Sequence, residues 1–161
     1  FLCFSSLQFS PSLPSQAKRW PGRPSTTAAW PCQGDVPYPW GTEEPDDTEF
    51  QPCNIWQGQF PKVNTAVDGY RTTAPAKSFA PNGYGLYNIV GNVWEWTSET
   101  YRIRSLKKAA KTRMQAMAGH RVSKGGSYLC HRSYCWRYRI AARSGNSPDS
   151  STPHMGFRLV F

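Results

Sequence analysis

The sequence lacks three features that define common classes of protein. It has no pair of cysteines separated by two residues, no long apolar run, and only three histidines. The missing CxxC pairs argue against zinc ribbons and thioredoxin-like chemistry. A membrane-spanning helix needs about 20 mostly apolar residues, so we expect no membrane partner. His120, His131 and His154 show no pairing suited to the facial triad of a non-haem iron oxygenase.

Acidic residues are scarce as well. The sequence contains ten Asp and Glu but nineteen Lys and Arg, which gives a formal net charge of +9. Such an excess brings nucleic-acid binding into consideration. However, the basic insert at 100–120 has few aromatic residues to stack on bases, and no helix-turn-helix or zinc-finger spacing is present. We therefore expect this insert to be a solvated face or a flexible segment, with no nucleic-acid partner.

The first 31 residues differ in composition from the rest of the chain. They contain no Asp or Glu, are rich in Ser and Pro, and show no sustained period of 2 or 3.6 residues. We expect residues 1–31 to be a disordered or mistranslated segment. The folded domain is expected to occupy 32–161.

Frequent Gly, Pro and Asn interrupt the domain, a pattern that indicates loops and short strands. The best helix propensity lies at 104–118. In a strand near 136–143, the side chains of Trp136, Tyr138 and Ile140 would share one face. The C-terminal run GFRLVF, at 156–161, predicts a final strand.

The stretch GGSYLCHRSYCWRYR, at 125–139, holds two cysteines five residues apart, Cys130 and Cys135. Neither a straight strand nor a helix brings residues i and i+5 together, so the thiols meet only if the chain bends between them. Three interpretations stay open on spacing alone. They are a disulfide across the bend, two unpaired packing cysteines, or a two-thiolate site for a soft metal such as Cu(I).

Several segments together resemble one family. They are PWG at 39–41, CNIWQG at 53–58, NGYGLYNIVGNVWEWTSE at 82–99, the run at 121–151, and GFR at 156–158. These segments are similar to those of formylglycine-generating enzymes of the sulfatase-modifying factor family. The resemblance covers about 32–161, apart from the basic insert. It implies an irregular α+β sulfatase-modifying fold with a C-type-lectin-like core and little regular secondary structure, with the N-terminal half missing.

The resemblance also implies a chemistry. In this family the equivalents of Cys130 and Cys135 bind one Cu(I) as thiolates, and dioxygen oxidises a sulfatase cysteine to Cα-formylglycine. Ser127 matches the active-site serine, and Trp94 lines the same pocket. Tyr134 and Arg139 are secondary candidates. A soft cation suits this chemistry because it binds the substrate thiolate and passes electrons to oxygen.

The expected partners are unfolded sulfatase polypeptides with a CxPxR-type motif, and the expected location is the lumen of the endoplasmic reticulum. Because half of the family pattern is absent, we expect this chain to be a weakly active fragment. The alternative is a non-catalytic binding module of the same fold, like the paralogue that lacks the two cysteines.

The family pattern further implies two structural calcium sites. Calcium is a hard cation that binds carboxylate, amide and carbonyl oxygens. Asp68 and Glu95 are the only acidic residues between positions 50 and 98, and each falls in one of the two sets. The first set is Asn54, Ile55, Asp68 and Tyr70, and the second is Asn88, Gly91, Val93 and Glu95.

Overall fold

The computed structural model describes residues 36–103 and 107–159. The segment expected to be disordered or mistranslated, 1–31, lies outside the described residues. Within them the chain forms four strands and one helix: β1 (Trp94–Thr100), α1 (Lys108–Ala116), β2 (Arg121–Lys124), β3 (Ser144–Asn146) and β4 (Met155–Gly156). No helix in these ranges is long and apolar enough to cross a membrane.

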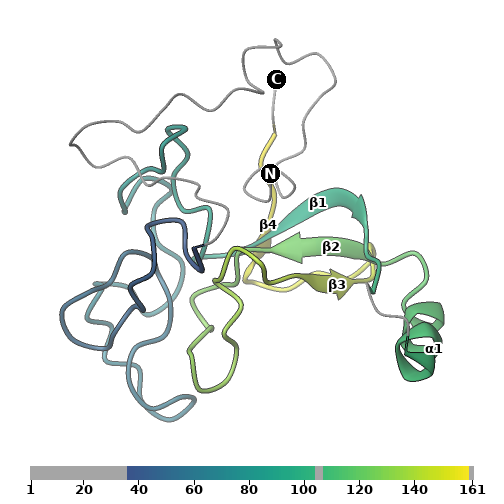
Figure 1. Ribbon diagram of the computed structural model, residues 1–161. Coiled ribbons are helices and arrows are strands. Elements are labelled where there is room, and N and C mark those ends of the chain that lie inside the picture. The colour runs from purple at the N-terminus through teal and green to yellow at the C-terminus, as the bar shows by residue number, and fades with distance from the viewer. Residues whose placement is uncertain (1–35, 104–106, 160–161) are drawn as a thin grey trace.

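The strands form one mixed sheet in the order β3-β2-β1-β4. β1 pairs with β2 antiparallel and with β4 parallel, and Glu95 lies opposite Lys124. Figure 1 shows the sheet on one side of a large irregular body of loops, with α1 at the far end of the sheet. The molecule is therefore a small α+β fold with little helix, as expected. The C-type-lectin-like core stays a prediction.

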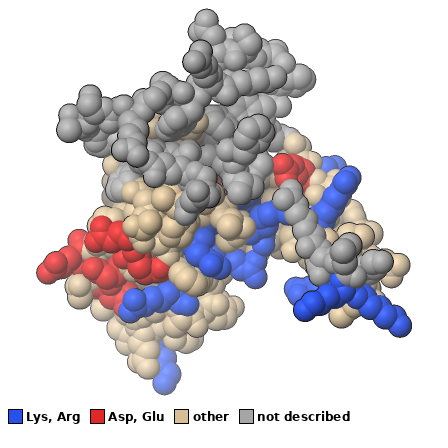
Figure 2. Space-filling view, in the orientation of Figure 1, with Lys and Arg blue, Asp and Glu red and all other residues tan. Residues whose placement is uncertain are grey.

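The helix expected at 104–118 is confirmed over Lys108–Ala116. Its Ala, Lys, Arg, Met and Gln residues are strong helix formers, and the chain leaves the helix through Gly119, whose φ of 82° suits a residue without a side chain. Most of its side chains whose exposure is described are exposed. Figure 2 shows basic side chains gathered around this end of the molecule.

One strand prediction is wrong, and a second is confirmed only at its first residue. Residues 136–143 form an irregular segment in which Tyr138 is buried but Trp136 is 40% exposed. They do not join the sheet, and the Ile140 N–H donates instead to the carbonyl of Pro37. Within the described part of GFRLVF, only Gly156 belongs to a strand, because β4 is limited to Met155–Gly156.

The irregular body is held together by side-chain amides rather than by strand ladders. Asn92 Oδ1 accepts from Asn54 Nδ2 at 3.2 Å and from the Ala74 N–H at 2.8 Å, while its Nδ2 donates to the Ala74 carbonyl at 3.1 Å. Both Asn54 and Asn92 are buried. One asparagine thus joins three loops whose buried backbone groups would otherwise lack partners.

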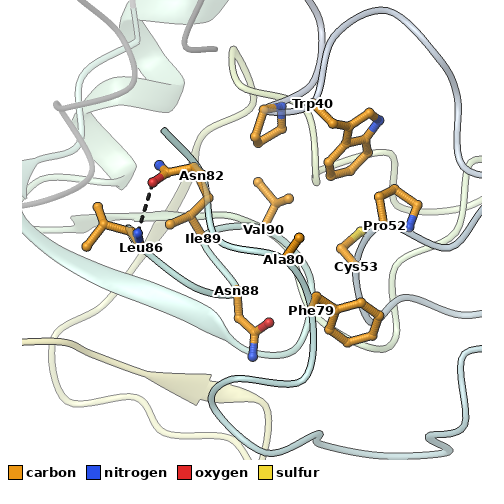
Figure 3. A pocket seen from close by; sticks show the side chains of 11 residues that line it. Trp40, Pro52, Cys53, Phe79, Ala80, Asn82, Leu86, Asn88, Ile89 and Val90 are labelled. Atoms are coloured by element: carbon orange, nitrogen blue, oxygen red, sulfur yellow. Dashed lines mark hydrogen bonds between the residues drawn. The ribbon is translucent and has the colours of Figure 1, made fainter. Parts of the chain in front are cut away.

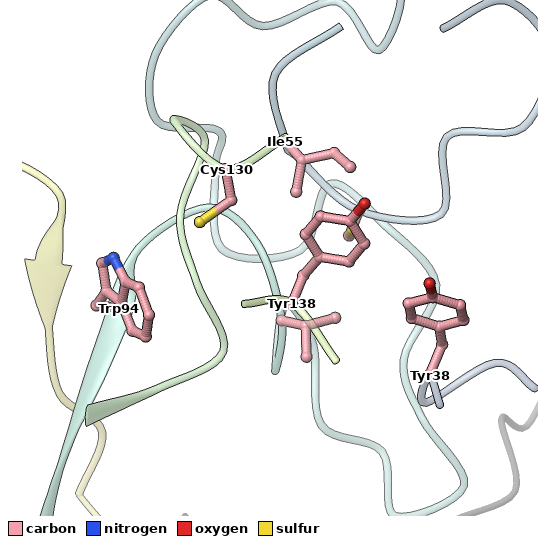
Figure 4. Packing of buried hydrophobic residues seen from close by; sticks show 7 residues of the cluster. Tyr38, Ile55, Trp94, Cys130 and Tyr138 are labelled. Atoms are coloured by element: carbon pink, nitrogen blue, oxygen red, sulfur yellow. The ribbon is translucent and has the colours of Figure 1, made fainter. Parts of the chain in front are cut away.

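The hydrophobic core lies between the loops and the sheet. Its buried members are Tyr38, Cys53, Ile55, Val90, Trp94, Cys130 and Tyr138. Figure 4 shows that they come from the irregular segments and from the start of β1. The core therefore fixes the position of the cysteine-containing segment relative to the sheet.

Candidate functional site

The two cysteines of the 125–139 stretch meet across a turn. Residues 132–134 bend the chain, and the N–H groups of Tyr134 and Cys135 both donate to the His131 carbonyl, at 3.0 and 2.8 Å. This brings Cys130 Sγ to 2.9 Å from Cys135 Sγ. The chain therefore makes the bend that convergence of the two thiols requires. Both cysteines are free thiols, so the structure does not contain the disulfide that spacing alone left open.

The two thiols differ in environment. Cys130 is 1% exposed and donates its S–H to Cys135, which is half-buried. The hydrogen bond to Cys135, together with burial, raises the pKa of Cys130. The same hydrogen bond lowers the pKa of Cys135, and the Arg137 charge acts in the same direction. The pair therefore favours one thiol beside one thiolate, and thiolates are the ligands of soft metals.

The Gly125–Gly126 turn after β2 places Ser127 beside the pair. Ser127 is 1% exposed, and its N–H lies 3.5 Å from Cys130 Sγ as a donor. Its hydroxyl oxygen accepts from the Leu129 N–H at 3.3 Å. Gly126 has a φ of 72°, and a Cβ there would lie 3.1 Å from Cys130 Sγ. The sulfur thus packs against a backbone position that has room for no side chain.

Trp94 reaches the same place from the sheet. It begins β1, is 9% exposed and belongs to the core cluster that contains Cys130. Figure 4 shows the Cys130 sulfur on the side that faces Trp94. The structure therefore brings together four predicted residues: Trp94, Ser127, Cys130 and Cys135.

The secondary candidates lie further out. Tyr134 is 69% exposed, and its ring stacks on Phe60 with a centroid distance of 4.3 Å. The Arg139 guanidinium lies 3.9 Å from the centroid of the Trp136 ring. Both residues are on the exposed side of the cysteine segment, where they could contact a bound polypeptide but not the buried thiol.

Three members of the first predicted calcium set, Ile55, Asp68 and Tyr70, lie close together. Asp68 Oδ1 accepts from the Tyr70 N–H at 2.9 Å. Burial raises the pKa of Asp68, while hydrogen bonds from Tyr70, Gln57 and Ile55 oppose the shift. Asn54 Oδ1, Gln57 Oε1 and Asp68 Oδ2 are buried without a hydrogen-bond partner. Unpaired buried oxygens are costly unless a cation or water satisfies them, so this donor set fits a hard cation. Sequence reasoning missed Gln57, which lies in the CNIWQG segment but carries no charge.

The second predicted set has a different arrangement. Glu95 is 7% exposed, and Arg158 Nε donates to both of its carboxylate oxygens at 2.9 Å. Arg158 Nη2 also donates to the carbonyls of Tyr87 and Asn88, at 3.1 and 3.4 Å. Asn88 Oδ1 is buried without a partner. The carboxylate of this set therefore already has a cationic partner, and calcium there would have to share Glu95 with Arg158.

The other two members of the second set are Gly91 and Val93. Gly91 has a φ of 71°, and a Cβ there would lie 2.5 Å from the Asn54 carbonyl oxygen. Val93 packs near Gly156 of β4. Among the residues described, no three or more His, Cys, Asp and Glu side chains cluster to hold a metal.

A small pocket lies beside the third described cysteine, Cys53 (Figure 3). Trp40, Phe79 and Val90 contribute to its lining, and its cavity volume is about 20 Å³, enough for about one water molecule. Burial raises the pKa of Cys53, and the negative charges of Asp68 and Glu44 add to the shift. Cys53 is thus an inert core thiol and no candidate for chemistry.

Comparison with known proteins matches these features to one family. A formylglycine-generating enzyme of Bos taurus is 50% identical over 149 residues, covering 88% of this chain and 39% of the relative. An "Inactive C-alpha-formylglycine-generating enzyme 2" of Mus musculus is 40% identical over 128 residues, covering 76% of this chain and 36% of the relative. Among solved structures, Treponema denticola variable protein 1 superposes with a TM-score of 0.40 at 27% identity, covering 55% of this chain and 32% of that chain.

The chain thus spans about two fifths of the length of these curated relatives. The family model of the sulfatase-modifying factor enzyme 1-like domain matches residues 15–161, which include every candidate residue described above. This chain belongs to the sulfatase-modifying factor enzyme 1-like family.

Proposed function

We propose that this chain carries the metal-binding part of a formylglycine-generating oxidase, which oxidises a sulfatase cysteine to Cα-formylglycine with dioxygen. The observation that supports the proposal best is the approach of two free thiols, Cys130 and Cys135, to 2.9 Å. Family membership supplies the expected substrate, an unfolded sulfatase segment with a CxPxR-type motif. We also propose the lumen of the endoplasmic reticulum as the location.

The donor set fits Cu(I). Two thiols converge, and their shared hydrogen bond favours a thiolate on Cys135. Soft thiolates select Cu(I) over hard cations. Cys130 and Cys135 would hold the metal, and Cu(I) when bound would supply a binding point for the substrate thiolate and electrons for dioxygen.

Four residues around the proposed metal site have separate roles. Cys130 must release its proton when a metal binds, since only the thiolate is a ligand. The N–H of Ser127 donates toward Cys130 Sγ and favours the charged sulfur. Trp94 covers the buried side and excludes water. Cys135 is the more exposed thiol, so the substrate cysteine approaches from its side.

We propose calcium as a structural cofactor at the first set, Asn54, Ile55, Asp68 and Tyr70. Its unpaired buried oxygens support this assignment. At the second set, Asn88, Gly91, Val93 and Glu95, calcium would share the Glu95 carboxylate with Arg158. We further propose that the mixed sheet and its long loops are part of a C-type-lectin-like core.

The test is metal binding followed by turnover. We expect the full chain to bind one Cu(I), measured by competition with a chromogenic chelator, and to convert a CxPxR peptide in the presence of a thiol reductant, measured by mass spectrometry. Cys130→Ser and Cys135→Ser should abolish both. Cys53→Ala removes a buried thiol outside the pair and is the matched control. Equal copper uptake by the Cys130→Ser/Cys135→Ser double variant would contradict the proposal.

The alternative is a non-catalytic binding module. The 40% identity to the mouse relative that is named inactive motivates it, whereas the presence of Cys130 and Cys135 argues against it. Because the chain spans about two fifths of its relatives, we propose that on its own it turns over slowly. Misplacement of a reacting group by about 1 Å costs about a hundredfold in rate. Peptide binding without aldehyde formation, in a copper-loaded chain, would establish the alternative.

A further inference from the structure

The acidic run at 43–49, here called the acidic loop, has a fixed shape. Asp46 Oδ1 accepts the N–H groups of Thr48, Glu49 and Phe50 at 2.7, 2.7 and 3.0 Å. These hydrogen bonds lower the pKa of Asp46 to about 2. Figure 2 shows a large group of acidic side chains on one side of the molecule and a smaller one on the other. Because these hydrogen bonds fix the backbone conformation of the acidic loop, the neighbouring carboxylates project in defined directions.

Glu44 of this loop accepts hydrogen bonds from three aromatic side chains. Trp136 Nε1 donates at 3.0 Å and the Tyr138 hydroxyl at 2.6 Å, although Tyr138 lies 94 positions away in the sequence. The Tyr38 hydroxyl donates to the other carboxylate oxygen. A carboxylate has about four acceptor positions, so all three donors can be satisfied. Tyr38 and Tyr138 are each 1% exposed, and their rings stack with centroids 5.9 Å apart. This packing restricts the rotation of both side chains, so their hydroxyl groups have few other hydrogen-bond partners.

Asp47 makes a second contact with the same segment. Its Oδ1 lies 3.5 Å from His131 Nε2, and His131 is 9% exposed. His131 directly follows Cys130, just as Trp136 directly follows Cys135. The acidic loop therefore contacts the residue after each thiol, on both sides of the turn that brings the sulfur atoms together.

We propose that the acidic loop is a two-point clamp that positions the thiol pair, with Glu44 holding Trp136 and Tyr138 and Asp47 holding His131. The identity of the ligand rests on the proposed function, but the positioning of the two sulfur atoms does not. Glu44 and Asp47 are positioning residues, since they touch neither sulfur. Changing residues of this outer kind typically lowers metal affinity about 10- to 100-fold.

The experiment compares Glu44→Gln and Asp47→Asn with Glu43→Gln in the full chain. Glu43 is the adjacent, exposed residue of the same type, so its variant makes the same change in charge without the aromatic contacts. The first readout needs no copper. Phenylarsine oxide condenses with two neighbouring thiols, releases water and binds well only when the sulfur atoms are close. We expect about tenfold weaker binding in Glu44→Gln, a smaller loss in Asp47→Asn and no change in Glu43→Gln.

A second readout reports on the contact itself. The Trp136 indole N–H resonance, assigned with Trp136→Phe, should shift in Glu44→Gln and stay in place in Glu43→Gln. Trp136→Phe also guards against loss of folding, because Trp136 is 40% exposed. That variant should keep the melting temperature of the wild type and still weaken arsenical binding.

The outcomes separate the clamp from the proposed function. Failure of the wild-type chain to bind Cu(I) would overturn the proposed function, while the arsenical and resonance comparisons would still decide the clamp. Equal arsenical binding in folded Glu44→Gln and Glu43→Gln, with an unmoved Trp136 resonance, would overturn the clamp whatever the copper result. With both intact, Cu(I) affinity should fall about tenfold in Glu44→Gln, and kcat should fall more than KM rises.

Discussion

Arg158 and Glu95 form a buried ion pair between residues 63 positions apart, in which Arg158 Nε donates to both carboxylate oxygens at 2.9 Å. It ties the segment after β4 to the interior of the sheet. The side chain of Glu95 is 9% exposed and that of Arg158 is 28% exposed. Glu95 therefore depends on this partner for its charge.

Arg158→Met should lower the free energy of unfolding by about 3 kcal/mol, because it leaves a buried charge without a partner. Urea denaturation measures the loss. Adding Glu95→Gln to Arg158→Met should cost less than the sum of the two single changes, since the pair acts as a unit. Strictly additive losses would mean that the two residues do not stabilise each other.

Gly126→Ala should disturb the thiol pair. A Cβ there would lie 3.1 Å from Cys130 Sγ, at a φ of 72°. Gly85 is the matched control, with a φ of 74° and nothing within 4 Å of the added carbon. We expect Gly85→Ala to cost about 1 kcal/mol in strain and Gly126→Ala more than that. Only Gly126→Ala should weaken Cu(I) binding. Equal effects on copper would show that the close contact is unimportant.

Calcium should stabilise the wild type through Asp68. At a calcium concentration 100 times the dissociation constant, a single site adds about 2.7 kcal/mol of stability. Asp68→Asn should remove most of the rise in melting temperature that calcium produces, because it removes the charged oxygen of the first set. The control is Glu49→Gln on the acidic loop, which is exposed. An unchanged calcium response in Asp68→Asn would exclude this site.

Lys124 should make stability rise with pH in the alkaline range. Its Nζ donates to the Ile140 carbonyl at 2.7 Å. Burial lowers its pKa to about 8, the Arg143 charge acts in the same direction, and Glu99 opposes them. An unfolded lysine titrates near 10.4. Between about pH 8 and 10.4 the unfolded chain therefore binds more protons than the folded chain, so stability increases with pH there.

Lys124→Met should flatten this increase, which denaturation at several pH values would detect. Lys62→Met, at an exposed lysine, is the matched control and should keep the slope of the wild type. A Lys124→Met variant with an unchanged slope would contradict the assignment.

Local sequence was a good guide where a short motif determines local structure. The helix near 108–116 follows from its strong helix formers. The spacing of Cys130 and Cys135 showed that a bend was needed for the thiols to meet, but not that the chain makes it. The alternation at 136–140 led to an incorrect strand prediction, because alternating apolar residues indicate which side chains are buried but not which structure buries them. Tyr138 is buried by stacking on Tyr38 and by Glu44, whereas Trp136 stays partly exposed under Arg139.

Local sequence patterns did not predict the contacts between residues that are far apart in the chain. Nothing in the sequence around 43–49 shows that Glu44 meets Tyr138, 94 positions away. Likewise, the sequence around Glu95 and around Arg158 does not indicate that these two side chains pair. Such pairs depend on how the loops pack, which an isolated sequence window does not specify.

The hairpin of β1 and β2 ends where Thr100 pairs with Arg121. Beside this pair, the Tyr101 N–H donates to the His120 carbonyl at 2.8 Å, so the two ends of the connection lie together. Within this connection the described side chains of α1 are mostly exposed, and Met117, just after the helix, lies against Gly145 of β3. An affinity handle or a fluorescent reporter spliced into the exposed helix should therefore leave the thiol pair undisturbed. Immobilising the protein through this site would leave the irregular loop body, which lies at the other end of the molecule from α1 in Figure 1, free to meet a polypeptide.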